Sequence, residues 1–247
     1  MSKRKLEATR ANQERKQVRG GRRLPPGAKI RTRRQPPWLW LGAAGAVVLV
    51  AAVVVFLVTR GGGDSGKNAA PKAIPWSQFR GLQTGPAPWT PGINLLSQRI
   101  QVLNLDSPQG MTEGQSQHTH QHVDLWIDGK KVTVPASVGI NEAQQYLTDL
   151  HTHDATGIIH VESRDKNRKF VLGQFFGVWG VKLTPTCIGR YCAGGGKELR
   201  VWVDGKRLTT NPALVPLEEH TEVAIAYGTP AQMPKKVPSS YAFPAGV

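Results

Sequence analysis

Histidine is concentrated in one short stretch of the chain, together with acidic residues. Six of the seven histidines lie between residues 118 and 160. Imidazole and carboxylate groups in combination are typical ligands of divalent transition metals. The candidate ligands are His120, His122, His151, His153 and His160, with His118, Asp154 and Glu162 as secondary candidates. The sequence therefore predicts a metal site in this stretch.

The first three histidines occur at every second residue. Side chains alternate between the two faces of a strand, so His118, His120 and His122 share one face, which Asp124 continues. Neighbours on that face lie about 6–7 Å apart at Cα, close enough for two imidazoles to bind one ion. The apolar residues between and after them are expected to face the core.

The remaining candidates repeat this spacing further along the chain. His160 and Glu162 are two residues apart on another predicted strand, and His151 and His153 lie in the segment before it. Asp154 is placed either to bind the ion or to accept a hydrogen bond from an imidazole N–H. A hydrogen-bonded polar cluster, a pH-sensitive patch and chance exposure stay open as alternatives.

Several metals suit such a ligand set. The Irving–Williams order favours copper(II), zinc suits the same ligands, and iron and manganese remain in range. Copper(I) is disfavoured because only Met111 and Met233 lie beyond residue 58. Six histidines exceed the needs of one ion, so a site for two ions also stays open.

The pattern favours capture, storage or delivery of a metal ion, with two alternatives. In the first, an ion with an open coordination position activates water or oxygen, Glu162 or Asp154 is the base, and the chain is a metal-dependent enzyme. In the second, the chain is an accessory or assembly subunit with a membrane-protein partner. No Gly-x-Ser-x-Gly, P-loop or dinucleotide-binding motif occurs in the sequence.

A repeated segment supplies the elements that must position these residues. Residues 123–133, VDLWIDGKKVT, align without gaps on residues 199–209, LRVWVDGKRLT. In each copy an Asp-Gly pair between two alternating runs predicts a two-residue hairpin turn. A third strand is predicted at residues 157–162 in the first copy and at 222–227 in the second.

The second copy of the repeat is an internal control. In the alignment, His118, His120 and His122 match Gly194, Gly196 and Glu198, and His160 matches Ile225. The predicted scaffold therefore does not need the histidines, which favours a chemical role for them.

Further elements are expected around the two copies. Alternation predicts a strand at residues 100–105, and helices are predicted at 141–147, with Asn141 as the cap, and at 172–179. The expected divisions are a basic arm at 1–37, a transmembrane helix at 38–58, a Gly/Pro-rich tether and extended segment at 59–98, a His-rich β module with a helical insert at 99–195, a second β module at 196–228 and a Pro-rich tail at 229–247. The expected fold class is mainly β with short helices (α+β), with one N-terminal transmembrane helix and two related β-hairpin modules, the second resembling a β-grasp arrangement.

Charge and hydropathy predict attachment to a membrane. Residues 38–58 are uncharged and mostly Ala, Val and Leu, long enough to cross a hydrocarbon core of about 30 Å as a helix. Residues 1–37 carry 13 Lys and Arg against 2 acidic residues, which places the N-terminus in the cytoplasm. We expect an uncleaved single-pass anchor in the cell membrane, the lipid bilayer as a partner, and an extracytoplasmic C-terminal part. The arm lacks the aromatics or helix-turn-helix pattern of a nucleic-acid binder.

Two cysteines, Cys187 and Cys192, lie in the part expected to be outside the cytoplasm. A disulfide between them is the default prediction in an oxidising compartment. Their spacing differs from the C-x-x-C of a redox-active dithiol.

Together the motifs resemble a family of uncharacterised, single-pass membrane-anchored bacterial proteins that is frequent in actinobacteria. The resemblance rests on the stretches HTHQHVDLWIDGKKVTVPASVGI, LHTHDATGIIHVES and LGQFFGVWGVKL and covers residues 115–228. The shared features are an H-x-H strand, an HTHD-x2-GIIH-x-E core and a Gly-Gln-Phe-Phe-x-x-Trp-Gly helix. Because the family carries no assigned activity, the resemblance groups the motifs without implying a function.

Overall fold

The two Asp-Gly hairpins form the framework of the structure. The computed structural model describes residues 68–107, 111 and 116–247. The hairpin strands are β1 (Gln117–Ile127) with β2 (Lys130–Val132), and β9 (Glu198–Val203) with β10 (Lys206–Arg207). Asp128 and Gly129 have φ of 51° and 80°, and Asp204 and Gly205 have φ of 50° and 74°. Both turns thus have the two positive φ values that the Asp-Gly signal predicts.

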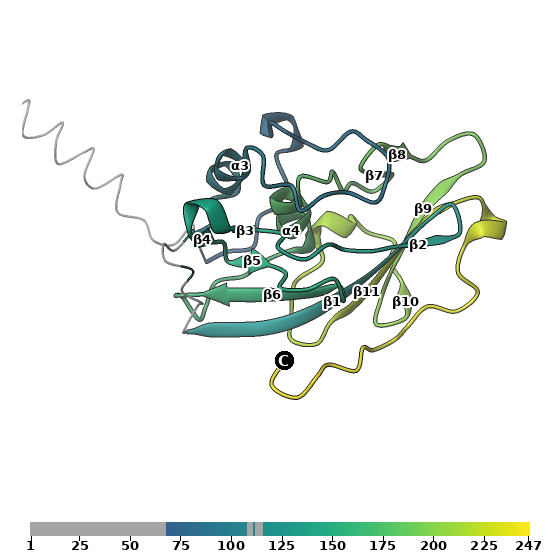
Figure 1. The fold of residues 1–247 in the computed structure, drawn as a ribbon. Helices are drawn as coiled ribbons and strands as arrows, with labels where there is room; N and C mark the ends of the chain where they lie inside the picture. Colours follow the sequence, from purple (N-terminus) through teal and green to yellow (C-terminus); the bar gives the residue numbers. More distant parts are fainter. Residues whose placement is uncertain (1–67, 108–110, 112–115) are drawn as a thin grey trace, which may run out of the picture. The chain divides into compact units, whose positions relative to one another are not determined.

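All the hairpin strands belong to one seven-stranded sheet (Figure 1). The strand order is β10-β9-β11-β1-β6-β5, and β2 also pairs with β1. The added strands are β5 (Leu150–His151), β6 (Ile158–Ser163) and β11 (Glu222–Gly228). β11 runs antiparallel to β9 and parallel to β1, so it joins the two copies of the repeat.

The predicted architecture, a transmembrane helix followed by two β modules, needs correction. The described part of the chain is mainly β with two short α-helices, and both copies share one sheet because β11 pairs with each of them. Among residues 68–107, 111 and 116–247, no helix has the length and apolar character needed to cross a membrane. The predicted membrane span at 38–58 and the basic arm at 1–37 lie outside the described residues.

The third strands of the two copies are not equivalent. β6 pairs with the first half of β1, on the edge that β2 also uses, whereas β10 and β11 lie on opposite edges of β9. The sequence alignment of His160 with Ile225 is therefore wrong in three dimensions. Ile225 pairs with Val201 and Leu125, while His160 pairs with His120.

The predicted strand at residues 100–105 is wrong, because the chain there is helical. Helix α3 spans Leu96–Leu103 and buries Leu96, Ile100 and Leu103 on one side. These three positions follow the i, i+4, i+7 spacing of a helix face. A six-residue window fits this period and the two-residue period of a strand equally well.

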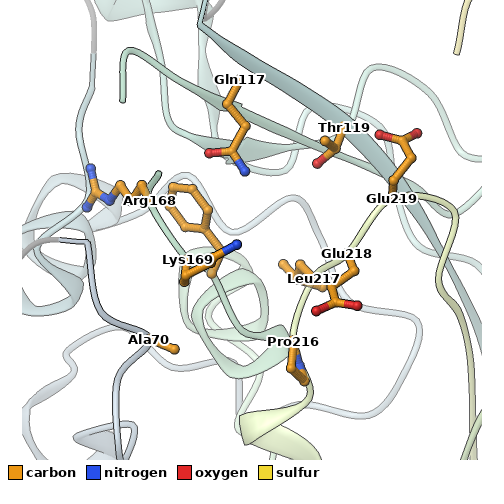
Figure 2. Close-up of a pocket in the computed structure, with 10 residues that line it drawn as sticks. Ala70, Gln117, Thr119, Arg168, Lys169, Pro216, Leu217, Glu218 and Glu219 are labelled. Carbon is orange, nitrogen blue, oxygen red and sulfur yellow. The ribbon is translucent and has the colours of Figure 1, made fainter. Parts of the chain in front are cut away.

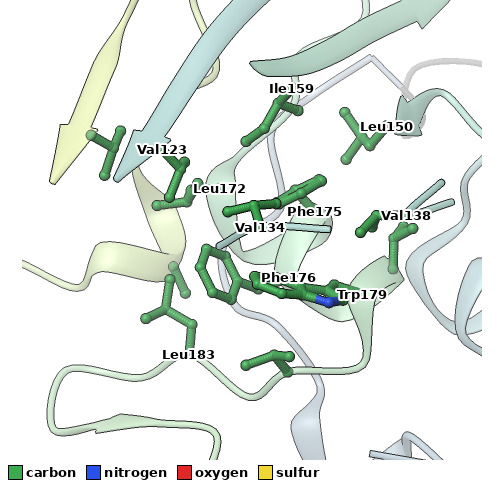
Figure 3. Packing of buried hydrophobic residues seen from close by; sticks show 14 of the residues in the cluster. Val123, Val134, Val138, Leu150, Ile159, Leu172, Phe175, Phe176, Trp179 and Leu183 are labelled. Carbon is green, nitrogen blue, oxygen red and sulfur yellow. The ribbon is translucent and has the colours of Figure 1, made fainter. Parts of the chain in front are cut away.

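Helix α4 (Leu172–Trp179) has the predicted bounds and organises the core. All of its residues are buried, and Phe175, Phe176 and Trp179 pack together with Val123 and Ile159 of the sheet (Figure 3). The alternation along β1 decides which side chains take part, since every second residue faces the helix. The apolar core therefore occupies one face of the sheet.

Buried Arg99 of α3 ties the two helices together. Its guanidinium donates to the carbonyls of Gly177 at 2.9 Å and Val178 at 3.1 Å, near the C-terminus of α4. Burial lowers the pKa of Arg99 to about 10. A cation at this place satisfies carbonyls that lack partners within the helix and complements the helix dipole.

Short elements complete the described part of the chain. They are strands β3 (Ile140–Asn141), β4 (Tyr146–Leu147), β7 (Cys187–Ile188) and β8 (Tyr191–Cys192), and 3₁₀ helices η2 (Trp76–Gln78), η3 (Glu142–Gln144), η4 (Pro212–Leu214) and η5 (Pro230–Gln232). The predicted helix at 141–147 is shortened to η3: the Asn141 side chain does accept a hydrogen bond from the Gln144 N–H, but Gln145 is left-handed. β4 follows immediately.

The face of the sheet opposite α4 is partly covered by the C-terminal segment, which runs along it after η5 (Figure 1). The ring of Tyr241 stacks on the ring of His122 from β1, with centroids 3.8 Å apart. Further along β1, His120 and His118 lie on this same face. The predicted metal ligands are thus on the side of the sheet away from the apolar core.

Candidate metal centre

Strand pairing brings histidines from three neighbouring strands into one row. In the register of the sheet, His120 of β1 is opposite His160 of β6, and His160 is opposite His151 of β5. In the next row, His118 is opposite Glu162. Directly paired residues on a sheet have Cβ atoms about 5 Å apart, so their imidazoles are in contact range. The row is a consequence of register, which the spacing within each strand does not reveal.

The imidazoles converge as two pairs around His160. The Nε2 atoms of His118 and His120 are 3.1 Å apart, and those of His151 and His153 are 3.2 Å apart. The ring of His160 lies between the pairs, with its centroid 4.6 Å from that of His120 and 4.4 Å from that of His153. Five of the predicted ligands therefore form a single cluster.

The carboxylate of Glu162 lies at the base of this cluster. Its side chain is fully buried, and its Oε1 is 3.2 Å from His118 Nε2 and 3.6 Å from His151 Nε2. The same oxygen is 3.9 Å from Nδ1 of His160. A buried carboxylate is costly without a counter-charge or hydrogen-bond donors, so these histidines, or an ion bound by them, must stabilise it.

Hydrogen bonding fixes which nitrogen of His151 is available. Its Nδ1 donates to the backbone carbonyl of Thr148 at 2.9 Å, because a carbonyl oxygen only accepts. The lone pair of the ring is then on Nε2, which faces His153 and Glu162. Metal-binding histidines are commonly held in this way by a second partner behind the ring.

Burial keeps the central imidazoles neutral. It lowers the pKa of His151 to about 3, against the opposing effect of the bond to Thr148. It also lowers the pKa of His160 to about 3, with a further contribution from His151 and His153. The pKa of His120 is lowered as well, first by burial and then by His118. Neutral imidazoles carry the lone pairs that metal ions need.

The distances in the cluster match those between ligands of one ion. In a tetrahedral site with metal–nitrogen distances of about 2.0–2.1 Å, two ligand nitrogens lie about 3.3 Å apart. The Nε2–Nε2 and Nε2–Oε1 distances around His151 are 3.2 and 3.6 Å. Ligand atoms within 4.8 Å of one another occur in one group of His151, His153, His160 and Glu162, and in another of His118, His120 and His160.

The structure separates His122 from this cluster. Its Nδ1 is 2.7 Å from Glu222 Oε2, and its Nε2 is 2.9 Å from the carbonyl oxygen of Thr156. His122, Asp124 and Glu222 form a third group of suitable spacing, all three buried. Both ring nitrogens of His122 face oxygen acceptors, and Lys131 pairs with Asp124 at 2.7 Å. This arrangement is a buried hydrogen-bonded pair that links β1 to β11.

Asp154 belongs to none of the three groups. It is exposed, and its Oδ1 accepts a hydrogen bond from the Thr156 N–H at 2.9 Å and also contacts the Thr156 hydroxyl. These bonds lower the pKa of Asp154, to which the nearby His160 and His153 also contribute. Asp154 therefore stabilises the turn between β5 and β6 and places a negative charge beside the cluster.

The sequence gives no signal for Glu222 and Glu219, two acidic residues near the histidines. Glu222 meets His122 because β11 pairs in parallel with β1, 100 residues earlier in the chain. Glu219 lies before β11, and its Oε1 is 3.9 Å from Nδ1 of His120. Both contacts depend on a long-range strand pairing that no local motif encodes.

A pocket of about 350 Å³ lies beside the same strand (Figure 2). Gln117 and Thr119 of β1 line it, with Glu219 at its margin. These two β1 residues alternate with His118 and His120, so the pocket lies on the opposite face of the strand from the histidines. Its lining contains no group of metal-binding spacing among the described residues.

Cys187 and Cys192 form a disulfide that closes the β7–β8 hairpin. The hydroxyl of Tyr227 donates to the carbonyl of Cys192 at 3.1 Å, which attaches the hairpin to β11. The cysteines are therefore structural and do not contribute sulfur ligands to the histidine cluster.

Comparisons of the chain with family models, curated proteins and solved structures find no match. The resemblance to a bacterial membrane-anchored family consequently stays a prediction.

Proposed function

We propose that this chain is an extracytoplasmic binding protein for a divalent transition metal, zinc or copper(II), which it captures, stores or delivers. The primary site consists of His151, His153, His160 and Glu162. The observation that carries the proposal is the Nδ1 atom of His160, which is buried without a hydrogen-bond partner and faces Glu162. A buried polar atom of this kind is costly unless something binds it.

A metal ion accounts for this arrangement better than hydrogen bonds alone. A shared proton can link the Nε2 atoms of His151 and His153, but it leaves Nδ1 of His160 unsatisfied. A cation among the four groups takes one lone pair from each, including that of Nδ1 of His160, and offsets the charge of the buried Glu162 carboxylate.

The number of donors favours binding over catalysis. Catalytic zinc sites have three protein ligands and an open position, whereas closed sites have four. His151, His153, His160 and Glu162 supply four. Three nitrogens and one oxygen suit zinc and copper(II), and the set has no thiolate or thioether to favour copper(I).

The location of the protein is proposed from the disulfide. A Cys187–Cys192 bond persists in an oxidising compartment and is rare in the cytosol. The metal would then be taken up outside the cytoplasm, where no reducing system removes the bond.

Titration of the full-length chain with zinc and with copper(II) tests the proposal. After removal of metal by a chelator, calorimetry should show at least one equivalent bound with a Kd below about 1 μM, which corresponds to about 8 kcal/mol. His151→Asn should weaken binding at least about 100-fold, because it removes a ligand whose tautomer is already set.

His220→Asn is the matched control. His220 is the seventh histidine and is 55% exposed, and its Nε2 is 2.9 Å from Glu219. It belongs to none of the ligand groups, so this variant should bind metal with unchanged affinity. The proposal fails if the wild-type chain takes up less than about 0.2 equivalents of either metal.

A further inference from the structure

The primary site leaves one pair of converging histidines unused. The Nε2 atoms of His118 and His120 are 3.1 Å apart, which nearly equals the 3.2 Å between those of His151 and His153. His118, His120 and His160 satisfy the ligand spacing by themselves. The cluster therefore contains a second set of nitrogens with the geometry of the first.

The two pairs are alike in burial. In each pair one ring is buried. Nδ1 of His151 donates to Thr148 O at 2.9 Å, whereas Nδ1 of His120 has the carboxylate of Glu219 at 3.9 Å, which is an ion-pair distance beyond hydrogen bonding. The buried ring then directs Nε2 toward the Nε2 of a more exposed partner. For His151, the acceptor behind Nδ1 leaves the lone pair on Nε2, where it can bind an ion.

His160 and Glu162 lie between the pairs and can serve both. The ring centroid of His160 is 5.8 Å from that of His118 and 5.4 Å from that of His151. Oε1 of Glu162 is 3.2 Å from Nε2 of His118 and 3.6 Å from Nε2 of His151. An ionised carboxylate has two oxygens and can bind one ion with each of them.

Charge near the cluster also suits more than one cation. Glu162 is buried beneath the rings, Glu219 faces His120, and Asp154 interacts electrostatically with His153 and His160. The three carboxylates carry a total charge of −3, which is more than one divalent ion neutralises. With two divalent ions bound, the net charge of ions and carboxylates is +1.

We infer that the cluster is a two-ion centre, in which His151 and His153 hold one divalent ion, His118 and His120 hold a second, and His160 with Glu162 lies between them. The inference rests on the proposed function. The side chain of His118 is 43% exposed, so the second ion is the one nearer to solvent. It should bind more weakly and exchange faster than the first.

Copper(II) titration of the full-length chain, followed by electron paramagnetic resonance, tests the inference. We expect two equivalents bound, and with two bound ions a signal broadened or reduced by magnetic coupling between them. Zinc titration should give the same stoichiometry. The double variant His118→Asn/His120→Asn should bind one equivalent and give the sharp signal of an isolated ion, with circular dichroism confirming that it is folded.

The outcomes separate this inference from the proposed function. A wild-type chain that binds one equivalent overturns the two-ion centre and leaves the proposed function standing. Two equivalents without magnetic coupling also overturn it, because the second ion then lies elsewhere. A chain that binds neither copper nor zinc overturns the proposed function itself.

Discussion

The two hairpins of the repeat have the same turn but different surroundings. Each has a Trp opposite a cation on the partner strand: Trp126 opposite Lys131, and Trp202 opposite Arg207. The two strands differ before the aligned segments, which begin at residues 123 and 199. β1 already begins at Gln117, six residues earlier, whereas β9 begins at Glu198, one residue earlier. The additional residues of β1 carry His118 and His120 and pair with β6.

This difference separates the residues that build the sheet from those that build the site. The shared hairpin appears in both copies, so its turn and apolar positions are requirements of the fold. The extension of β1 occurs only in the first copy. At the matching positions of the second copy, Gly194, Gly195 and Gly196 form a loop. The extension, β6 and β5 therefore constitute a specialised region, and the predictions that follow test this division.

Metal should stabilise the chain only through the specialised region. At a free zinc concentration about 1,000-fold above Kd, the expected gain in the free energy of unfolding is about 4 kcal/mol. Differential scanning calorimetry should show a higher Tm with zinc for the wild-type chain and a clearly smaller shift for His160→Asn. An equal shift in that variant would place the ion outside the cluster.

The metal-free chain should lose stability as the pH falls, because of the same region. The pKa of His151 and of His160 is about 3 in the folded state, below the ordinary value of about 6.5. Between these values the unfolded chain binds more protons, so the free energy of unfolding decreases as the pH falls, by about 1.4 kcal/mol per pH unit for each histidine. We expect a loss of about 4 kcal/mol between pH 7 and pH 5.

Urea denaturation at several pH values measures this loss. His151→Asn should have a shallower pH dependence than the wild-type chain, whatever its absolute stability. Identical slopes in the two chains would show that His151 titrates normally in the folded state.

Substitution of the turn glycines should affect the two hairpins unequally. Gly129 and Gly205 both have positive φ, which costs an Ala side chain about 1 kcal/mol. A Cβ at Gly205 would also lie 2.9 Å from Cβ of Ser239, whereas at Gly129 the nearest atom is 3.6 Å away. Chemical denaturation should therefore show a loss of about 2 kcal/mol for Gly205→Ala and about 1 kcal/mol for Gly129→Ala. The reverse order would contradict the close approach of the C-terminal segment to the turn at Gly205.

Loss of the cross-strand cation–π contact of the second hairpin should have the smallest effect. Nζ of Lys131 is 6.0 Å from the ring centroid of Trp126, and Cζ of Arg207 is 5.1 Å from that of Trp202. Such contacts contribute about 0.5–1 kcal/mol at exposed sites. Arg207→Ala should lower the free energy of unfolding by less than about 1 kcal/mol, measured by denaturation. Lys131→Ala should cost more, because Lys131 also pairs with the buried carboxylate of Asp124 at 2.7 Å. Zinc affinity, measured by calorimetry, should stay unchanged in Arg207→Ala.

Local patterns predicted part of the fold well. The Asp-Gly turns, the strand at Ile158–Ser163 and helix α4 follow from alternation, turn chemistry and aromatic spacing, which act over a few residues. The strand predicted at 100–105 failed because a short apolar run fits two periods. Its helical state is decided by packing of Leu96 and Ile100 in the core, beyond the reach of a local window.

The candidate site was predictable in composition but not in arrangement. Two-residue spacing identified His118 and His120 as neighbours, and likewise His160 and Glu162. The spacing could not show that His122, on the same face, pairs with Glu222 instead, because that contact joins strands 100 residues apart.

The amino-acid sequence by itself determined the hairpins, the buried helix and the concentration of imidazoles, since each depends on neighbouring residues. Only the tertiary structure decided which imidazoles meet. The register of β1, β6 and β5 places His120, His160 and His151 in one row, and the pairing of β11 with β1 withdraws His122 from it. Strand register is set by packing of the whole sheet, so the ligand set is a property of the fold and not of any one motif.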